Sequence, residues 1–381
     1  MAHPPTRRTP AAYGPDHGGK ASPADVRRYN RRAIFGLLFP RERLSRAELG
    51  RRTGLSRVAV SDVVSEMLRD GLLRESGLEE SHGKGKRGTL LEVDPDRLRV
   101  VSVDLSQSHL LQGAVTDLLG RPIRHAERAL SEGNHVEADD IAALVDELMA
   151  AEDGGRIVGV GVATPGIVSE DGVVRESTNL GWYGYDLRSA LQERYDVPVS
   201  VDNDAQSAML AERFFGQGGP NLMFIRVRRG IGAGLLIADR PLIGESHASG
   251  EIGHISIEPE GPLCPCGKHG CLERLISAPN LERELAEAPE GGRDAVLRRA
   301  GGVLGKALAP IIGMVDMTDV CVYGPPHIIN DVMLDAAQEY LDRAASASYR
   351  TRTVVRRCMC GGDITIQGEA VSVTFDYIAR R

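Results

Sequence analysis

The 381-residue sequence predicts a winged helix-turn-helix at the N-terminus, followed by an α/β body. Two capped helices stand ahead of a basic glycine-rich hairpin, and apolar runs then alternate with helical stretches. The charge is also uneven. Residues 1–99 hold 20 Lys and Arg against 13 Asp and Glu, a surplus of 7 bases, whereas the rest holds 26 against 40, a deficit of 14. A basic front end on an acidic body indicates a polyanionic partner for the front end.

Length and composition bound the class of protein. A chain of 381 residues with 42% hydrophobic and 26% charged residues is typical of a globular protein of two or three domains. No apolar run approaches the roughly 20 residues of a membrane helix, and the N-terminus lacks the apolar core of a secretory signal. We therefore expect a cytoplasmic protein with no membrane segment.

The N-terminal region divides into a tail and a small domain. Residues 1–24 are rich in Pro and Gly and are predicted to be a disordered tail. Apolar residues at helical spacing behind a basic start predict a first helix over residues 27–39. The winged helix-turn-helix domain is expected over residues 27–96.

The helix-turn-helix is predicted from capping signals. Ser45 and Glu48 fit an S-x-x-E capping box that opens one helix, Gly54 ends it, and Ser56 caps the next helix. Two helices joined by a short glycine-containing turn form this motif. The second helix is expected to bury Val60, Val63, Val64 and Leu68.

A basic hairpin follows the two helices. Strands are predicted at residues 72–74 and 89–93, on either side of the sequence SHGKGKRG. Lys84, Lys86 and Arg87 form its tip and suit phosphates or a minor groove. The phosphate contacts are expected to include Arg27, Arg28, Arg31 and Arg32.

The second helix of such a motif enters the major groove with its first residues at the base edges. Arg57 suits guanine, and Ala59 and Val60 suit thymine methyl groups. The expected base contacts are Ser56, Arg57, Ala59, Val60 and Ser61. The alternative is a protein-interaction module whose hairpin is only a solvated charge run.

The body is predicted to be α/β because buried strands end in glycine-rich or acidic turns and alternate with helical stretches. In such bodies, ligands gather beyond the strand ends. The expected strands lie in residues 100–108, 158–166, 197–205, 221–238 and 319–326.

Three of the six cysteines lie in EGPLCPCGKHGCLE, and a histidine precedes them with the spacing H-x9-C-x-C-x4-C. Clustered cysteines in a large intracellular chain suggest a metal or redox site rather than a disulfide framework. His254, Cys264, Cys266 and Cys271 complete a tetrahedral zinc shell with no open position, which favours a structural Zn²⁺ over a catalytic one. The alternative is a chance grouping of thiols. The expected non-ligands are Cys321, Cys358 and Cys360.

The stretch EIGHISIEPEGPLCPCGKHGCLE resembles the signature of the ROK family (repressors, open reading frames and sugar kinases). The resemblance extends to ATPGIV, STNLGW, DNDAQSA and GIGAGLL, and covers the chain from about residue 27 onward. It implies a two-lobed actin-like ATPase (ROK) body over residues 98–381, which binds an effector sugar between its lobes and forms dimers.

The resemblance also implies functional residues. It places zinc on the four residues of the cysteine cluster. It implies sugar contacts from Gly166, Asn179, Asn203, Asp204, Glu251, His254 and Glu273. Carboxylates and amides satisfy sugar hydroxyls directionally, and His254 has one ring nitrogen for zinc and one for the sugar.

The family contains both kinases and regulators. In its kinases the position of Asp204 holds the general base, and the first phosphate loop reads D-x-G-G-T. Here that loop is Asp104–Ser108, DLSQS, which lacks the glycines that allow backbone N–H groups to approach a phosphate. Arg228–Arg229 stand in place of the small hydroxyl residue that usually precedes the second glycine loop, and the adenosine-side loop, which usually has two glycines, is Tyr323–Pro326 with Gly324 as its one glycine. The sequence therefore predicts a regulator with no catalytic residue.

The predicted protein is a homodimer or homotetramer on double-stranded operator DNA, with a sugar or sugar phosphate as effector. It resembles the family's xylose and N-acetylglucosamine repressors. Arg228 and Arg229 favour an anionic effector, or are only surface charge. Two alternatives stay open: an active sugar kinase with an appended DNA-binding domain, and a DNA-binding protein that responds to a protein partner.

Overall fold

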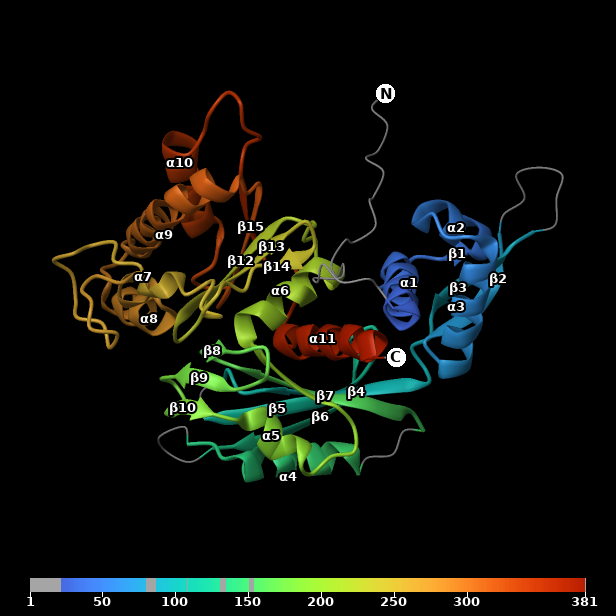
Figure 1. Ribbon diagram of the computed structural model, residues 1–381. Coiled ribbons are helices and arrows are strands. Elements are labelled where there is room, and N and C mark those ends of the chain that lie inside the picture. The colour runs from blue at the N-terminus through green and yellow to red at the C-terminus, as the bar shows by residue number, and fades with distance from the viewer. Residues whose placement is uncertain (1–21, 80–86, 108, 131–134, 151–153, 381) are drawn as a thin grey trace. The chain divides into compact units, whose positions relative to one another are not determined.

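The computed structural model describes residues 22–79, 87–107, 109–130, 135–150 and 154–380 (Figure 1). Most of the predicted tail, together with Lys84, Lys86 and Ser108, lies outside these residues. The chain forms two compact units. The first comprises Met1–Phe215, Ala238–Arg240 and Asp363–Arg381, and the second comprises Gly216–Ile237 and Pro241–Gly362. No helix of the described residues is long and apolar enough to cross a membrane.

The N-terminal part of the first unit has three helices and three short strands. They are α1 (Pro23–Leu38), β1 (Leu44–Ser45), α2 (Arg46–Thr53), α3 (Arg57–Asp70), β2 (Leu73–Leu78) and β3 (Thr89–Val93). The strands form an antiparallel sheet in the order β1-β3-β2. The two helices separated by a short turn, and the hairpin after them, are present as predicted.

Local capping sets the helix boundaries. Ser22 and Asp25 form a reciprocal capping box, so α1 begins at Pro23, inside the predicted tail and ahead of residue 27. Ser45 accepts a hydrogen bond from the Glu48 N–H, but the Glu48 carboxylate pairs with arginines of its own helix. Only half of the predicted capping box therefore forms. Gly54 ends α2 in the left-handed region at φ 73°.

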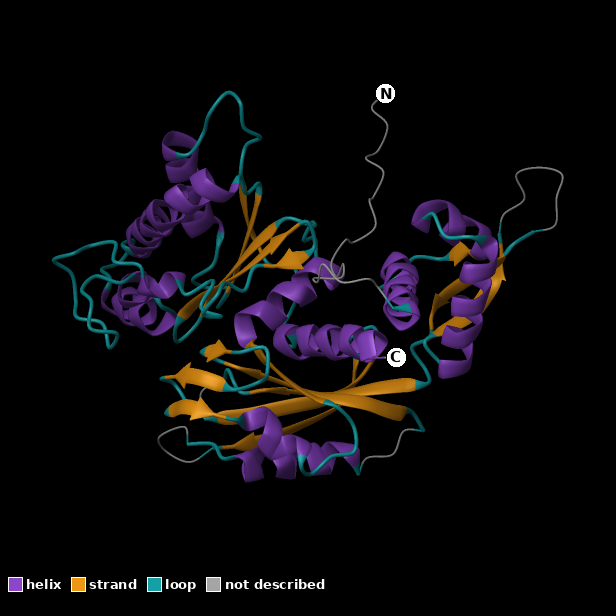
Figure 2. Ribbon diagram, in the orientation of Figure 1, coloured by secondary structure: helices purple, strands orange, loops and turns teal. Residues whose placement is uncertain are grey.

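A five-stranded sheet forms the centre of the first unit, in the order β11-β7-β4-β5-β6 (Figure 2). Alternate residues of β4 face opposite sides, as expected of a strand. Leu98 and Val100 join the hydrophobic cluster of α1, α3 and α11, whereas Val101 and Val103 join that of α4 and α5. The elements are β4 (Leu98–Asp104), β5 (Leu110–Asp117), β6 (Pro122–Ala129), α4 (Ala138–Met149), β7 (Arg156–Thr164), α5 (Leu187–Gln192), β11 (Val199–Asn203), α6 (Asp204–Phe215) and α11 (Ile364–Arg380).

A small antiparallel sheet, which the sequence did not predict, follows β7. It consists of β8 (Ile167–Val168), β9 (Val174–Ser177) and β10 (Trp182–Tyr185).

A second five-stranded sheet, in the order β14-β13-β12-β15-β16, lies with its helices in the second unit, apart from Arg240 of β14, which belongs to the first unit. The single run predicted at residues 221–238 is two strands, because the chain reverses at Arg228–Gly230 and the two halves pair antiparallel. The elements are β12 (Leu222–Val227), β13 (Ile231–Ile237), β14 (Arg240–Pro241), the 3₁₀ turn η1 (Ile252–His254), α7 (Leu272–Ile276), α8 (Ala278–Glu287), α9 (Arg293–Val315), β15 (Asp319–Tyr323), α10 (Asp331–Ala344) and β16 (Val354–Arg357).

Candidate functional site

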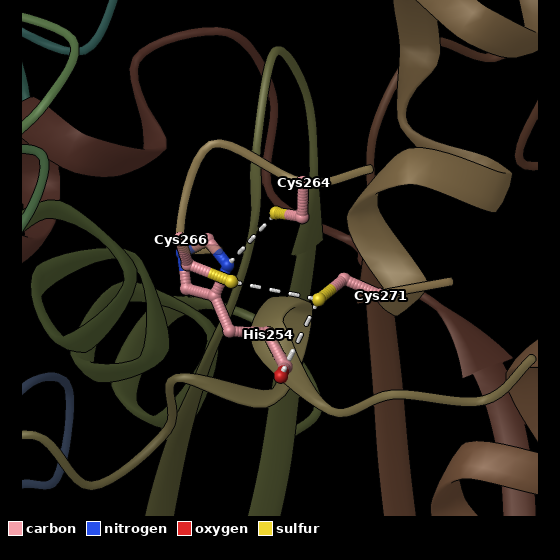
Figure 3. A group of neighbouring side chains, drawn as sticks. All are labelled: His254, Cys264, Cys266 and Cys271. Carbon is pink, nitrogen blue, oxygen red and sulfur yellow. Dashed lines mark hydrogen bonds between the residues drawn. The ribbon is translucent and has the colours of Figure 1, made fainter. Parts of the chain in front are cut away.

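The second unit gathers His254, Cys264, Cys266 and Cys271 at one point (Figure 3). Their ligand atoms all lie within 4.8 Å of one another. The His254 Nδ1 lies 3.6 Å from Cys264 Sγ, and Cys266 Sγ lies 3.6 Å from Cys271 Sγ. The spacing therefore identified a real cluster.

These distances fit a tetrahedral metal ion. Zn–S bonds of about 2.3 Å and a Zn–N bond of about 2.0 Å give tetrahedral edges of about 3.5–3.8 Å. Both 3.6 Å separations match such edges. Since His254 presents Nδ1 to the cluster, its Nε2 lies on the other side of the ring.

The loop around the cluster is fixed by its own backbone. The Cys264 N–H donates to the carbonyl of Lys268 at 2.8 Å, and the Gly267 N–H donates back to Cys264 at 2.9 Å. Gly267 and Gly270 have positive φ angles of 87° and 60°. A Cβ on Gly270 would lie 1.6 Å from the Glu258 carbonyl oxygen, so this position requires glycine.

The three thiols differ in acidity. Backbone hydrogen bonding from Lys268 lowers the pKa of Cys266 to about 7. Burial, followed by the neighbouring thiols, raises the pKa of Cys271 to about 12. Burial also raises the pKa of Cys264. Three thiolates in so small a volume need a cation, which a divalent metal supplies.

The remaining predicted sugar ligands of the second unit lie beside β13. Glu251 precedes η1, and Glu273 lies in the first turn of α7, two residues after Cys271 of the cluster. The Glu273 Oε2 accepts a hydrogen bond from the Ile231 N–H at 3.3 Å. A Cβ on Gly230 would lie 2.7 Å from the same Oε2. The glycine that resembled part of a phosphate loop therefore makes room for Glu273.

The predicted sugar ligands of the first unit lie at strand ends. Asn203 ends β11, and Asp204, which is buried, begins α6. The Asn203 side chain donates to the Gly166 carbonyl at 2.8 Å and accepts from the N–H groups of Ala205 and Gln206. Asn203 thus caps α6 and holds the turn after β7. Asn179 is exposed in the turn between β9 and β10.

The phosphate-loop position is occupied by internal hydrogen bonds. Asp104, fully buried, accepts from the Ser106 N–H at 2.8 Å and from the Gln112 amide at 2.9 Å. In the second unit, the Arg228 guanidinium donates to the Tyr323 hydroxyl at 2.9 Å and lies 5.2 Å from the centroid of the Tyr323 ring. Arg229 is exposed.

The first turn of α3 carries most of the predicted base contacts. Ser56 and Arg57 are exposed, and Ala59 and Ser61 are partly buried. Val60 is only 1% exposed, because it packs in the core with Val63, Val64 and Met67. The base contact predicted for Val60 is therefore corrected, since a core side chain cannot reach a base edge.

Val58 is the functional candidate that the sequence prediction omitted. Val58 is 70% exposed. The helical period anchored on the buried valines of α3 already places residue 58 on the outer face. Arg87, at the described end of the hairpin, is exposed as well.

One predicted phosphate contact is also corrected. The Arg31 side chain is fully buried and pairs with Glu66 and Asp70 of α3. It ties α1 to α3 and has no path to a phosphate. Arg27 and Arg28, by contrast, keep exposed side chains beside Glu66 and Asp25.

The sequence profile of the ROK family matches residues 108–355. The chain belongs to the ROK family. The xylose repressor of Bacillus subtilis (strain 168) is 30% identical over 267 residues, 68% of each chain. The DNA-binding transcriptional dual regulator NagC of Escherichia coli K12 is 25% identical over 376 residues, 89% of this chain and 92% of NagC.

Solved structures show the same fold. A ROK family transcriptional regulator described as a homologue of the E. coli MLC protein has a TM-score of 0.79 at 21% identity, covering 93% of this chain and 98% of its own. The ROK hexokinase of Thermus thermophilus has a TM-score of 0.59 at 27% identity, covering 72% of this chain and 97% of its own. The ROK fold and the predicted likeness to xylose and N-acetylglucosamine repressors are confirmed.

Proposed function

We propose that this protein is a sugar-responsive DNA-binding transcriptional regulator, a repressor whose operator affinity changes when a sugar or sugar phosphate binds. The observation that carries the proposal is the N-terminal arrangement of three helices, α1 to α3, and the antiparallel sheet β1-β3-β2 on a ROK body, which we interpret as a winged helix-turn-helix. The match to the ROK regulator spans 93% of this chain, whereas the match to the hexokinase spans 72%. A relative named as a xylose repressor and another named as a DNA-binding transcriptional dual regulator support the same function.

The proposed DNA interface is the outer face of α3 with the hairpin beside it. Ser56, Arg57 and Ser61 are its polar base contacts, Ala59 and Val58 are its apolar contacts, and Arg87 binds phosphate together with Lys84 and Lys86. Arg57 in the first turn suits the two acceptors of guanine. The exposed Val58 replaces Val60 as the main partner of a thymine methyl group.

The proposed metal is a structural Zn²⁺ on His254 and the three cysteines. Three thiolates and one imidazole form a closed shell, which leaves no position for activating water. Since Glu273 is two residues beyond Cys271, the ion fixes the start of α7 and with it this carboxylate. His254 binds the metal through Nδ1 and offers Nε2 to the effector.

The proposed effector groups are Asn203 and Asp204 of the first unit and Glu251, His254 and Glu273 of the second. An Asn amide has two N–H donors, so one remains after the bond to Gly166. Gly166 has a φ of 104°, and a Cβ there would meet the Glu176 carbonyl at 2.1 Å. The turn thus stays close to Asn203 without a side chain of its own, and Asn179 is an additional candidate contact.

Two observations favour regulation over kinase activity. The Asp104 carboxylate is already bound by Ser106 and Gln112, and side chains stand where a phosphate loop has glycines. Arg228 stacks on Tyr323 at the position of the adenosine-side loop. Asp204 is therefore proposed as a sugar contact and not as a general base.

A homodimer is the proposed DNA-binding form, because paired recognition helices read half-sites about one helical turn apart. The effector changes operator affinity only through its differential affinity for two arrangements of the chain. Couplings of this kind change affinity roughly 5- to 150-fold.

The test begins with selection of an operator from randomised duplex DNA by the full-length protein. A symmetric enriched sequence is the expected result, and no enrichment would contradict the proposal. ADP release is measured in parallel with ATP and a panel of hexoses and pentoses. Sugar-dependent ADP release at ordinary kinase rates would support the alternative of a kinase with an appended DNA-binding domain.

A further inference from the structure

Five phenylalanines meet where α1 joins the body of the first unit. The chain has only 6 Phe. Phe39, directly after α1, has ring centroids at 5.4 Å from Phe35, 5.1 Å from Phe214, 5.9 Å from Phe215 and 5.4 Å from Phe375. We call these five residues the aromatic junction. Phe39 is its centre and is only 4% exposed.

The junction is part of one continuous core. A single hydrophobic cluster contains residues of α1 and α3 together with Val100 of β4, Val158 of β7 and Val371 of α11. The helix-turn-helix is therefore packed against the body through buried apolar contacts, and does not hang from it by a linker alone. A displacement of the body helices must be accommodated at these contacts.

Helix α6 connects the junction to the proposed effector site. It begins at Asp204, capped by Asn203, and ends at Phe215 after 12 residues. A helix of this length spans about 18 Å as one stiff element. One end thus carries two proposed effector contacts, and the other carries two rings of the junction, Phe214 and Phe215.

Helix α11 reinforces this connection. Ser372 donates to Asp202 at 2.7 Å, and Ser207 of α6 donates to Glu369. A Cβ on Gly368 would lie 1.7 Å from the Ser207 carbonyl oxygen, so the two helices are in backbone contact. Phe375 of α11 stacks on Phe214 at 5.5 Å. The two helices are therefore expected to move together.

The path continues from α1 to the DNA-binding helix. The buried Arg31 guanidinium of α1 pairs with both Glu66 and Asp70 of α3. Removing one partner of a buried ion pair is costly, so α3 is expected to follow α1.

We infer that Phe39 is a positioning residue that transmits effector binding to DNA: sugar at Asn203 and Asp204 shifts α6 and α11, and the Phe39 ring carries that shift to α1 and α3. The inference rests on the proposed function. It assigns the coupling to a residue that belongs neither to the proposed effector site nor to the proposed DNA interface.

The variant Phe39→Leu keeps an apolar side chain but removes the ring. Operator affinity is measured by fluorescence anisotropy with and without D-xylose, D-glucose, N-acetyl-D-glucosamine and the 6-phosphates of the last two. Wild type is expected to show an effector-dependent change of roughly 5- to 150-fold with one of these probes. The ratio of the operator dissociation constants with and without the probe is expected to fall below about 2-fold in Phe39→Leu. The affinity for the same probe, measured by calorimetry, stays within about 3-fold of wild type.

Phe224→Leu is the matched control, because Phe224 is the one phenylalanine outside the junction and is fully buried in β12. It is expected to keep the wild-type ratio. Phe214→Leu, at a partly buried position, is the second junction variant in case Phe39→Leu does not fold, and it is expected to lower the ratio in the same direction.

An unchanged ratio in a folded junction variant overturns the inference and leaves the proposed function standing. A wild-type protein that binds its selected operator but responds to none of the probes overturns both. An equal loss of ratio in Phe224→Leu also overturns the inference, because general loosening of the fold would then explain the effect.

Discussion

The metal loop of the second unit and the aromatic junction of the first are stabilised in opposite ways. The tip of the loop has little apolar packing, because Leu263 is 60% exposed and Cys266 is exposed, whereas Cys264 and Cys271 are buried. Bonds to the proposed metal are therefore expected to add to the backbone hydrogen bonds that hold the loop. The junction has no candidate ligands and consists of packed rings, with Phe35 fully buried. One region should therefore respond to metal removal and the other to lost apolar volume. This difference allows each to be disrupted separately.

The largest expected effect is on the metal loop. Cys266→Ser should lower the bound metal from about one ion per chain to near zero, since a four-ligand shell loses one thiolate. Because the Cys266 side chain is exposed, the change leaves no buried cavity. Atomic absorption of the purified protein measures the metal content, and Cys321→Ala, in β15 away from the cluster, should retain it. Full metal content in Cys266→Ser would refute the assigned ligand set.

The aromatic junction should show the reverse behaviour. Phe35→Ala is expected to lower the free energy of unfolding by about 3–5 kcal/mol, the usual cost of emptying a Phe site in a core. Hydrogen exchange should speed up in both α1 and α11, because Phe35 also packs on Phe375 at 5.7 Å. Metal content should not change. Faster exchange confined to α1 would mean that the two helices do not share one cooperative core.

The stability of the first unit is also expected to depend on pH through a buried carboxyl group. Burial raises the pKa of Asp202 to about 6, with Ser372 opposing and Asp376 adding to the shift. Since the folded state holds this proton more tightly, its stabilising contribution is complete below pH ~4 and is lost as pH rises through about 6.

Wild type should lose free energy of unfolding as pH rises from 4 to 7, and Asp202→Asn should remove about 2 kcal/mol of that loss by linkage. Urea unfolding across that range measures the slope. The neighbouring Glu369 and Asp376, whose pKa values are also raised by burial, should keep a residual slope. A variant with the wild-type slope would show that Asp202 is not the group that titrates.

The smallest expected effect concerns the DNA-facing side of the first unit. Val58→Ala should weaken binding to the selected operator by about 1 kcal/mol at one thymine. Replacing that thymidine by deoxyuridine removes only the methyl group of the base. It should weaken wild type and leave Val58→Ala nearly unchanged. If the affinity losses from Val58→Ala and from removal of the methyl group were additive at every thymine, the proposed contact would be contradicted.

The difference between the two regions also explains what the sequence could predict. The cluster of His254 and the three cysteines lies within residues 254–271, and the caps at Ser45 and Ser56 depend on neighbours three residues away, so short motifs predicted both. Phe39, Phe214 and Phe375 are separated by most of the chain, and no local pattern predicts that they meet. The orientations of Val58 and Val60 could have been predicted from the sequence with one more step. Val63 and Val64 define the buried face of the helix, and the helical period then places Val60 on that face and Val58 on the opposite one.

The measurement that tests the account most directly is the operator affinity of the full-length, zinc-loaded protein with and without sugar. One sugar or sugar phosphate is expected to change the dissociation constant for the selected operator by roughly 5- to 150-fold, and ATP with the same sugar is expected to yield no ADP. An affinity that no sugar changes, or sugar-dependent ADP formation at ordinary kinase rates, would contradict the account.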